Sequence, residues 1–217
     1  MSILVEYQKE WTKLYKAESK MLKKALGKDC LTIYHIGATA CEGMPAKPII
    51  DTLVVLRDHA DAKALTNCGY IKRRDDVYTT EHDGMQYRVV CVPAKDKETI
   101  ALHMAYLNYF LGQKQHTEEF AQKKRAIAEQ YADDTNGYEN AKKALFEELA
   151  PIALKHKEKT ERQSTGLAIG MCLGCGVGTA LGFAFGNVGI GICLGVSIGM
   201  CFGLALGLAG TSKKSDK

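Results

Sequence analysis

The sequence has no charged residue between Arg162 and Lys213, although Asp, Glu, Lys and Arg make up 25% of its 217 residues. Glycine is concentrated in the same stretch, where 14 of the 21 glycines lie between Gly166 and Gly210. A run of this length without charge excludes one uniform soluble domain, because charged side chains cover the surface of such domains. We therefore expect a soluble domain joined to a membrane-type tail.

The sequence also lacks several patterns that would assign a function directly. The formal net charge of +4 is small, so no nucleic-acid partner is expected. The eight cysteines show no spacing typical of a zinc site or a disulfide framework, which favours a reducing cytosol for the soluble part. No glycine-rich dinucleotide motif and no P-loop is present. The first residues, MSILVEYQKEW, carry charges before any long apolar run, so no signal peptide is expected.

Hydrophobic periodicity and turn residues predict the elements of the charged part. Helices are expected at residues 5–26, 58–67, 97–111, 117–131 and 138–157, and strands at residues 31–36, 49–56, 70–80 and 85–92. Asp58 is expected to cap the second helix, Gly69 to end it, and Pro151 to bend or shorten the last. This order of elements predicts an α+β domain with a small mixed sheet flanked by helices.

The stretch HIGATACEGMPAKPIIDTLVVL, which begins at His35, is the best candidate for a functional site. It predicts two strands joined by a loop that contains Gly37, Thr39, Gly43 and Lys47, and the second strand carries Asp51. A carboxylate in a buried strand is costly unless it is paired or holds a cation. The loop fits a phosphate cradle, because glycine allows close backbone approach and lysine adds charge. The alternative is a tight loop that needs glycine for its backbone angles.

The segment HIGATACEGMPAKPIIDTLV closely resembles the core motif of the GrpB-like family, which usually reads HxGSTAVPGLxAKPIIDILV. The resemblance extends from about Val5 to about Leu149 and does not include the tail. Further matches to the family lie downstream, at His103, Tyr109, Tyr131, Asp133, Asp134, Tyr138, Lys142 and Phe146. The family is placed in the nucleotidyltransferase superfamily, so the resemblance implies a nucleotidyltransferase-like fold.

The resemblance makes Asp51 the candidate catalytic residue and the candidate Mg²⁺ ligand. Nucleotidyltransferases place two carboxylates at positions i and i+2 of one strand, where both face the nucleotide phosphates and hold Mg²⁺. Here Leu53 stands at the second position, as is usual in the GrpB-like family. The alternative is a structural Asp51 that accepts hydrogen bonds from the 37–39 loop or pairs with Lys47. The sequence leaves both interpretations open.

Further positions depart from the family pattern. Ala38 replaces the usual serine, which removes one phosphate contact and leaves Thr39. The family's histidine cluster is absent from the last strand, where Arg88 is the obvious polar substitute. Leu107 and Asn108 replace the family's usual Arg-Asp pair. These changes indicate a divergent member whose chemistry is weakened or altered.

Four other side chains are candidate ligand-binding residues. His35, at a strand end, and His103, in the first half of a helix, could orient a ligand, although each is at least as often a hydrogen-bonded structural residue. Tyr138 and Lys142 lie one helical turn apart and could bring a hydroxyl group and a cation to the same cleft. The alternative for this pair is a solvated helix face with one buried aromatic ring.

Glycine recurs at every fourth position of the tail in two series. The members are Gly166, Gly170, Gly174, Gly178, Gly182 and Gly186, then Gly191, Gly195, Gly199, Gly203 and Gly207. Interior glycine costs a water-exposed helix about 1 kcal/mol, whereas in lipid it allows close helix packing. We expect a 1–157 nucleotidyltransferase-like domain, a 158–165 polar linker, a 166–210 glycine-zipper transmembrane hairpin and a 211–217 basic tail.

Basic residues flank the expected hairpin on both sides, at Lys155, Lys157, Lys159 and Arg162 and at Lys213, Lys214 and Lys217. This pattern predicts that both ends and the soluble domain lie on the cytoplasmic side of a membrane. The tail is expected to contact lipid and to self-associate through its glycine face.

Two functions stay open. The first is a membrane-tethered protein that binds a nucleotide or another phosphorylated small molecule and, as an enzyme, transfers nucleotidyl groups with Mg²⁺. The second is a non-catalytic binding or scaffold module whose tail anchors and oligomerises in the membrane.

Overall fold

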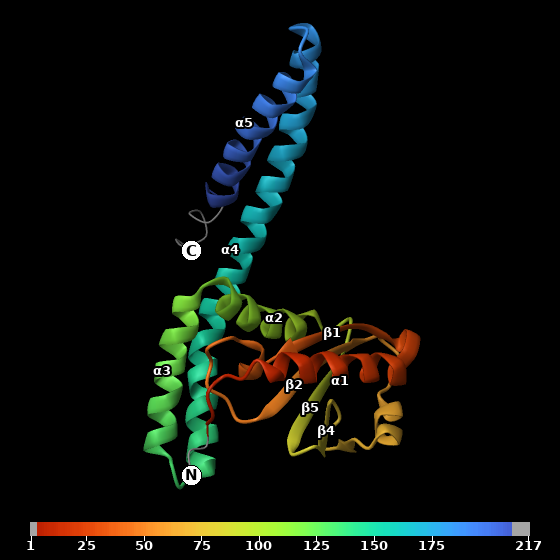
Figure 1. The fold of residues 1–217 in the computed structure, drawn as a ribbon, viewed down its shortest axis with the longest axis vertical. Helices are drawn as coiled ribbons and strands as arrows, with labels where there is room; N and C mark the ends of the chain where they lie inside the picture. The colour runs from red at the N-terminus through yellow and green to blue at the C-terminus, as the bar shows by residue number, and fades with distance from the viewer. Residues whose placement is uncertain (1–3, 210–217) are drawn as a thin grey trace. The chain divides into compact units, whose positions relative to one another are not determined.

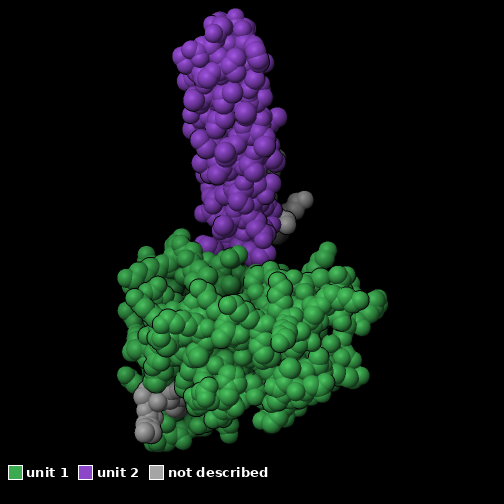
Figure 2. Space-filling model, turned by 45° about the vertical axis from the view of Figure 1, so that its right-hand side comes forward, with its two compact units in different colours: residues 1–154 green, residues 155–217 purple. Residues whose placement is uncertain are grey.

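The computed structural model describes residues 4–209, which fall into two compact units divided between Leu154 and Lys155 (Figures 1 and 2). The element order along the chain is α1 (Glu10–Leu26), η1 (Gly27–Asp29), β1 (Cys30–Ile36), η2 (Ala38–Ala40), β2 (Ile49–Leu56), η3 (Lys63–Cys68), β3 (Ile71–Lys72), β4 (Val77–His82), β5 (Met85–Pro93), α2 (Lys97–Gly112), α3 (Lys114–Gln130), α4 (Thr135–Ala184) and α5 (Val188–Ala209). The division lies close to the boundary expected after residue 157.

The first unit is built on a five-stranded mixed sheet with strand order β1-β2-β5-β4-β3. Only β2 and β5 pair in parallel within this described sheet, and the other neighbours are antiparallel. The parallel pair is possible because β3 and β4 form the connection between its two strands. The expected α+β fold with a small mixed sheet flanked by helices is confirmed.

Helices cover the two faces of this sheet, as Figure 1 shows. On one face Trp11 and Leu22 of α1 pack with Ile50 and Val54 of β2 in the largest buried cluster. On the other face Ile100 and Met104 of α2 pack against a cluster that includes Leu53. Since alternate residues of a strand share a face, Asp51 lies on the α2 face together with Leu53.

A third buried cluster joins the helices to the loop that follows β1. Phe110 of α2, Phe120 of α3 and Leu149 of α4 pack in it with Cys41 and Met44 of the loop. The loop between β1 and β2 is therefore held between the sheet and the helices. This packing places the motif residues beside helices that are distant in sequence.

In the N-terminal half of the chain, two expected helices and one expected strand differ from the structure. The strand expected at residues 70–80 is divided into β3 and β4, with residues 73–76 between them. The first helix begins at Glu10 rather than at residue 5, because Val5 is extended and exchanges two backbone hydrogen bonds of 2.9 Å with Ala46. The helix expected at residues 58–67 is replaced by the short 3₁₀ helix η3. Asp58 does not cap it, since its Oδ1 accepts a hydrogen bond from the Lys95 backbone amide at 2.6 Å. Gly69, with φ +84°, ends η3 as expected.

Helix α4 is longer than expected. Pro151 lies inside it without ending it, and residues 158–165, expected as a polar linker, are helical. Ion pairs at i, i+4 support this segment, with 2.7 Å between Lys157 and Glu161 and 2.6 Å between Arg162 and Glu158. The Lys- and Glu-rich composition that suggested a linker therefore belongs to an exposed helix.

The second unit contains the end of α4, a turn, and α5. Asn187 caps α5, because its Oδ1 accepts a hydrogen bond from the Ile190 amide at 3.2 Å. In the described part of the chain, α4 and α5 are each long and apolar enough to cross a membrane. The expected basic tail at residues 211–217 lies outside the described residues, as does Gly210.

The two glycine series face each other within this unit. A Cβ atom at Gly174 would overlap the carbonyl oxygen of Gly195, and one at Gly170 would overlap that of Gly199. Gly176, which lies outside the four-residue series, has open space at the same position. The glycine face expected to join separate copies is thus used inside one chain, where it allows the two backbones to approach closely.

Candidate functional site

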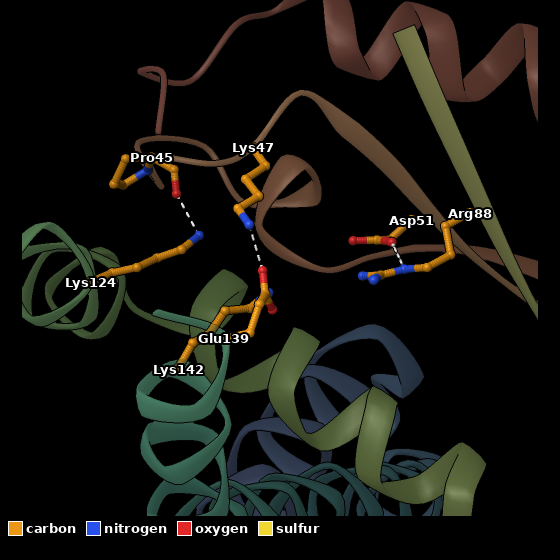
Figure 3. Close-up of polar contacts among 7 residues, drawn as sticks. All are labelled: Pro45, Lys47, Asp51, Arg88, Lys124, Glu139 and Lys142. Carbon is orange, nitrogen blue, oxygen red and sulfur yellow. Dashed lines mark hydrogen bonds and ion pairs between the residues drawn. The ribbon is translucent and has the colours of Figure 1, made fainter. Parts of the chain in front are cut away.

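A cavity of about 470 Å³ lies in the first unit beside the motif loop. Its walls come from the loop after β1, from the α2-facing side of β2 and β5, from the β3–β4 connection, and from α2, α3 and α4. The volume is in the usual range for a small-molecule site. Figure 3 shows the charged side chains of Lys47, Asp51, Arg88, Lys124, Glu139 and Lys142, together with Pro45.

Asp51 and Arg88 form an ion pair in the cavity wall. They are register partners in the parallel strands β2 and β5, and Arg88 Nε donates to Asp51 Oδ1 at 2.5 Å (Figure 3). Burial raises the pKa of Asp51, and the guanidinium group of Arg88 opposes that rise. Asp51 is thus paired, as its structural interpretation requires, but its partner is Arg88 rather than the expected Lys47.

Gly37 approaches Asp51 from the neighbouring strand end. Its φ is +75°, and a Cβ atom there would lie 2.7 Å from Asp51 Oδ2. The position therefore needs glycine both for its backbone conformation and for space. Thr39, two residues later, is buried and donates its hydroxyl hydrogen to the Ile49 carbonyl oxygen at 3.1 Å. These contacts fix the loop against the start of β2.

His35 is held away from the cavity by its own contacts. Its Nε2 lies 3.1 Å from the Thr39 hydroxyl oxygen, and its ring stacks on Tyr15 with 4.5 Å between centroids. Burial lowers the pKa of His35 to about 4, so the ring is neutral near pH 7. The structure therefore gives His35 a role in holding the loop, and it is not among the residues that line the cavity.

Helix α4 brings three polar residues, Tyr138, Glu139 and Lys142, to the part of the cavity that holds Lys47. Lys47 Nζ lies 2.5 Å from Glu139 Oε1, and Lys142 Nζ lies 3.3 Å from Glu139 Oε2 (Figure 3). Lys47 also lies over the Tyr138 ring, 4.8 Å from its centroid. Burial raises the pKa of Tyr138 to about 12, and its hydroxyl group has no hydrogen-bond partner among the described residues. Tyr138 and Lys142 both line the cavity.

His103 of α2 also lines the cavity. Burial lowers the pKa of His103, while the charge of Asp51 acts in the opposite direction and that of Arg88 adds to the lowering. A neutral imidazole offers one donor and one acceptor, so His103 can form hydrogen bonds to a ligand without adding charge.

The cavity wall contains a buried lysine that the sequence interpretation missed. Lys124 of α3 is 4% exposed, and its Nζ donates to the Pro45 carbonyl oxygen at 2.6 Å (Figure 3). Burial, assisted by the charge of Lys142, lowers the pKa of Lys124 to about 7. The sequence did indicate that Lys124 is buried, because Lys124 continues the helical spacing of the buried Thr117 and Phe120. Arg74 and Asp76, from the β3–β4 connection, are further lining residues without a motif.

The donor set does not fit a resident Mg²⁺ ion. Residues 4–208 contain no group of three or more His, Cys, Asp or Glu side chains placed to hold a metal. One oxygen of Asp51 already accepts from Arg88, and Leu53 supplies no oxygen at the second position. Cys41 is also unsuited to act as a thiol nucleophile, because burial raises its pKa to about 12.

The cavity lining as described has an excess of positive charge. Five Lys and Arg side chains line it against three carboxylates: Lys47, Arg74, Arg88, Lys124 and Lys142 against Asp51, Asp76 and Glu139. Aromatic rings line the same cavity at Tyr106, Phe110, Phe120, Tyr138 and Phe146. This combination suits an anionic ligand with an apolar or planar portion.

Comparison with known proteins agrees with this architecture. The family profile described as GrpB protein matches residues 2–151. A UPF0157 protein of Halalkalibacterium halodurans is 28% identical over 159 residues, which cover 67% of this chain and 79% of that protein. The glutamate-rich protein GrpB of Alkalihalophilus pseudofirmus is 26% identical over 161 residues, which cover 68% and 92% of the two chains.

The crystal structure of the conserved protein GrpB from Enterococcus faecalis has the same fold as the first unit. It aligns with a TM-score of 0.63 and 24% identity, covering 71% of this chain and 99% of its own. The family profile matches more than half of the sequence, and it ends before the glycine-rich tail. The chain belongs to the GrpB family.

Proposed function

We propose that this protein is a membrane-tethered GrpB-family binding module whose cavity takes a phosphorylated small molecule such as a nucleotide. The observation that carries the proposal is the positive excess of the cavity lining, where Lys47, Arg74, Arg88 and Lys142 outnumber the three carboxylates even when Lys124 is unprotonated. A bound phosphate group supplies the missing negative charge, and charge-assisted hydrogen bonds to it are strong.

Lys142 and Arg88 are the cations best placed to meet a phosphate group. Each already forms an ion pair, with Glu139 and Asp51 respectively, and those carboxylates hold the two cations at the cavity wall. The aromatic rings of Tyr106 and Phe146 line the same space and offer an apolar surface to a base or ring. The ligand class is therefore an anion joined to a planar or apolar group.

Binding is favoured over nucleotidyl transfer by the state of Asp51. Transfer with Mg²⁺ needs oxygen ligands on the protein in addition to the phosphates, and the β2 strand offers one carboxylate that is already engaged by Arg88. Mg²⁺ that arrives with a nucleotide could still contribute to affinity through the phosphates. Ligand binding is therefore measured both with and without Mg²⁺.

The membrane part of the proposal rests on the second unit. Its large apolar side chains are exposed, with exposed fractions of 67% for Leu173, 72% for Phe183 and 68% for Phe202. Contact with water at so many apolar positions is unfavourable, whereas hydrocarbon solvates them. A lipid bilayer is the environment that satisfies this surface.

The binding proposal is tested by thermal unfolding of the full chain in detergent micelles. ATP, pyrophosphate and inorganic phosphate are added with and without Mg²⁺, and adenosine serves as the phosphate-free control. At about a hundredfold excess over Kd a ligand stabilises the folded state by about 2.7 kcal/mol, which raises the melting temperature. A rise with adenosine equal to that with ATP, or no rise with any phosphorylated probe, would contradict the proposal.

Two neighbouring lysines of α4 provide a matched pair of variants. Lys142→Met removes a cation from the cavity wall, whereas Lys143→Met removes an exposed cation outside it. Loss of one charge-assisted hydrogen bond weakens binding by about tenfold, so Lys142→Met should raise Kd by that factor while Lys143→Met leaves it unchanged. Equal effects of the two variants would indicate long-range charge attraction rather than a site.

A further inference from the structure

Lys124 differs from its neighbours on α3 in where its amino group lies. Lys123 is exposed and Arg125 pairs with Glu6 at 2.8 Å, so both place their charge at the protein surface. The Lys124 side chain instead runs into the cavity wall and ends at the Pro45 carbonyl oxygen (Figure 3). A lysine usually keeps its amino group in water even when its stem is covered, so this placement needs an explanation.

The surroundings of Lys124 favour a neutral amine. An ammonium group has three N–H donors, and the described residues provide one acceptor, the Pro45 carbonyl oxygen. The titratable groups around it are Lys142 and Glu139 of α4, Asp51 of β2 and the buried thiol of Cys41. Glu139 and Asp51 are already paired with other cations. The pKa of about 7 reflects this balance and leaves much of the amine unprotonated near neutral pH.

A neutral lysine amine in a cavity is a nucleophile, because its nitrogen lone pair is free to attack. The hydrogen bond to Pro45 fixes one N–H and so restrains the direction of the lone pair. The cavity has room for a small molecule, and its cations attract an anionic one. Desolvation beside another cation is a known way to activate lysine toward carbonyl compounds.

We propose that Lys124 forms an imine with an aldehyde or ketone group of an anionic ligand bound in this cavity. The proposal rests on the proposed function for the anionic part of the ligand, and it adds the reactive group. It identifies the ligand class as a carbonyl compound that also carries a phosphate.

The reaction is balanced without any further reactant. The Lys124 nitrogen attacks the carbonyl carbon and the carbonyl π electrons move to oxygen, which takes a proton from nitrogen to give a carbinolamine. The hydroxyl group then leaves as water while the nitrogen lone pair forms the C=N bond and the nitrogen loses its second proton. Amine and carbonyl become imine and water, and nothing is oxidised or reduced.

The test uses the full chain in detergent micelles and pyridoxal 5′-phosphate as the probe, since it carries both an aldehyde and a phosphate. After a short reaction near neutral pH, borohydride reduces any imine to a stable secondary amine, and peptide mass spectrometry measures the label at each lysine. Lys124 should be labelled at least about tenfold faster than Lys123 because more of its amine is unprotonated. Labelling of Lys123 with Lys124 unmodified would overturn the proposal.

Pyridoxal without phosphate separates this inference from the proposed function. Faster labelling of Lys124 by the phosphorylated probe supports both. Equal labelling of Lys124 by the two aldehydes supports the reactive amine and contradicts phosphate recognition. A melting-temperature rise with the phosphorylated probe and no label on Lys124 supports phosphate recognition and overturns imine formation.

A matched pair of variants completes the test. Lys124→Met should abolish both the fast labelling by pyridoxal 5′-phosphate and the absorbance of the imine before it is reduced. Lys123→Met should retain both. Because the comparison of Lys124 with Lys123 is made within the wild-type chain, the proposal stays decidable if Lys124→Met fails to fold. Retention of the fast label and absorbance in a folded Lys124→Met protein would assign the reactive amine to another lysine.

Discussion

Arg88 donates to Asp51 across the parallel pair of β2 and β5, with 2.5 Å between Nε and Oδ1. The two side chains are unequally covered, since Asp51 is 13% exposed and Arg88 is 44% exposed. A carboxylate in so covered a place depends on its partner, whereas a guanidinium group that is half exposed can be solvated by water. The ion pair therefore stabilises the fold mainly because Arg88 compensates the negative charge of the largely covered Asp51 carboxylate.

This asymmetry predicts that Arg88→Met is more damaging than Asp51→Asn. Removal of Arg88 leaves a covered carboxylate without its partner, at a cost of about 1–3 kcal/mol in the free energy of unfolding. Removal of the Asp51 charge leaves a half-exposed cation, which should cost below about 1 kcal/mol. Thermal or denaturant unfolding of both variants measures the difference, and a larger loss in Asp51→Asn would contradict it.

The Arg88→Met deficit should depend on pH in one direction. Without Arg88, burial is opposed only by the charges of Lys142 and Lys124, so the pKa of Asp51 in the folded state rises further above the unfolded value of about 3.9. Stability from such a group is present below the unfolded pKa and is lost as pH rises through the folded pKa. The deficit of Arg88→Met relative to wild type should therefore shrink as the pH is lowered from 7 toward about 4.

The contact between Gly37 and Asp51 can be isolated with a second glycine of the same loop. Gly37 and Gly43 both have positive φ, at +75° and +84°, so alanine strains the backbone at either position. A Cβ at Gly37 would meet Asp51 Oδ2 at 2.7 Å, whereas one at Gly43 meets nothing within 4 Å. Gly37→Ala should lower the free energy of unfolding by about 1–2 kcal/mol more than Gly43→Ala. Equal losses would show that only the backbone matters.

Burial of Lys124 predicts a stability that rises with pH. Its pKa falls from the ordinary 10.5 to about 7 on folding, so the unfolded chain binds the proton more tightly over this interval. Stability then increases by up to about 1.4 kcal/mol per pH unit between the two values. The stability of wild type relative to Lys124→Met should grow from pH 7 toward pH 10, with Lys123→Met as a control that shows no such trend. A flat difference would contradict the lowered pKa.

The packing of the glycine series predicts opposite effects at two glycines of α4. Gly174→Ala would force a methyl group into the Gly195 carbonyl oxygen and separate the helices, whereas Gly176→Ala enters open space. The first should weaken the hairpin, and the second should leave it unchanged or strengthen α4 by up to about 1 kcal/mol through helix propensity. To compare the two variants, SDS is titrated into each protein in mild detergent. The measured quantity is the amount of SDS at which half of the helical circular dichroism signal is lost. Indistinguishable variants would contradict close packing.

The tail predicts how the protein distributes between fractions. The full chain should sediment with membranes and resist carbonate extraction, because its apolar helices need a hydrocarbon environment. Replacing Leu173 and Phe202 with Lys in one variant should move much of the protein to the soluble or aggregated fraction, since each charge is costly at the centre of a span. Full-length protein recovered in the soluble fraction without detergent would contradict the tether.

The sequence alone determined three of the strands and the two-part organisation, whereas the strand expected at residues 70–80 is divided into β3 and β4. Strand β2 has the expected bounds of 49 and 56, because long periodic or apolar runs specify their own structure. The resemblance of the motif also indicated the GrpB family before any fold was known. Local patterns were less informative at residues 5–9 and 58–67, where the expected helices are absent. Val5 instead pairs its backbone with Ala46, and the Asp58 side chain accepts a hydrogen bond from the distant Lys95 amide.

Only the tertiary structure decided the partners of the charged groups. Asp51 is 37 residues from Arg88, Lys47 is 92 residues from Glu139, and Lys124 is 79 residues from Pro45. No periodicity within a single segment encodes such pairs, because they depend on strand register and on how α3 and α4 close over the motif loop. For the same reason the two glycine series were recognised in the sequence, while their contact with each other was decided by the turn that folds α5 back on α4.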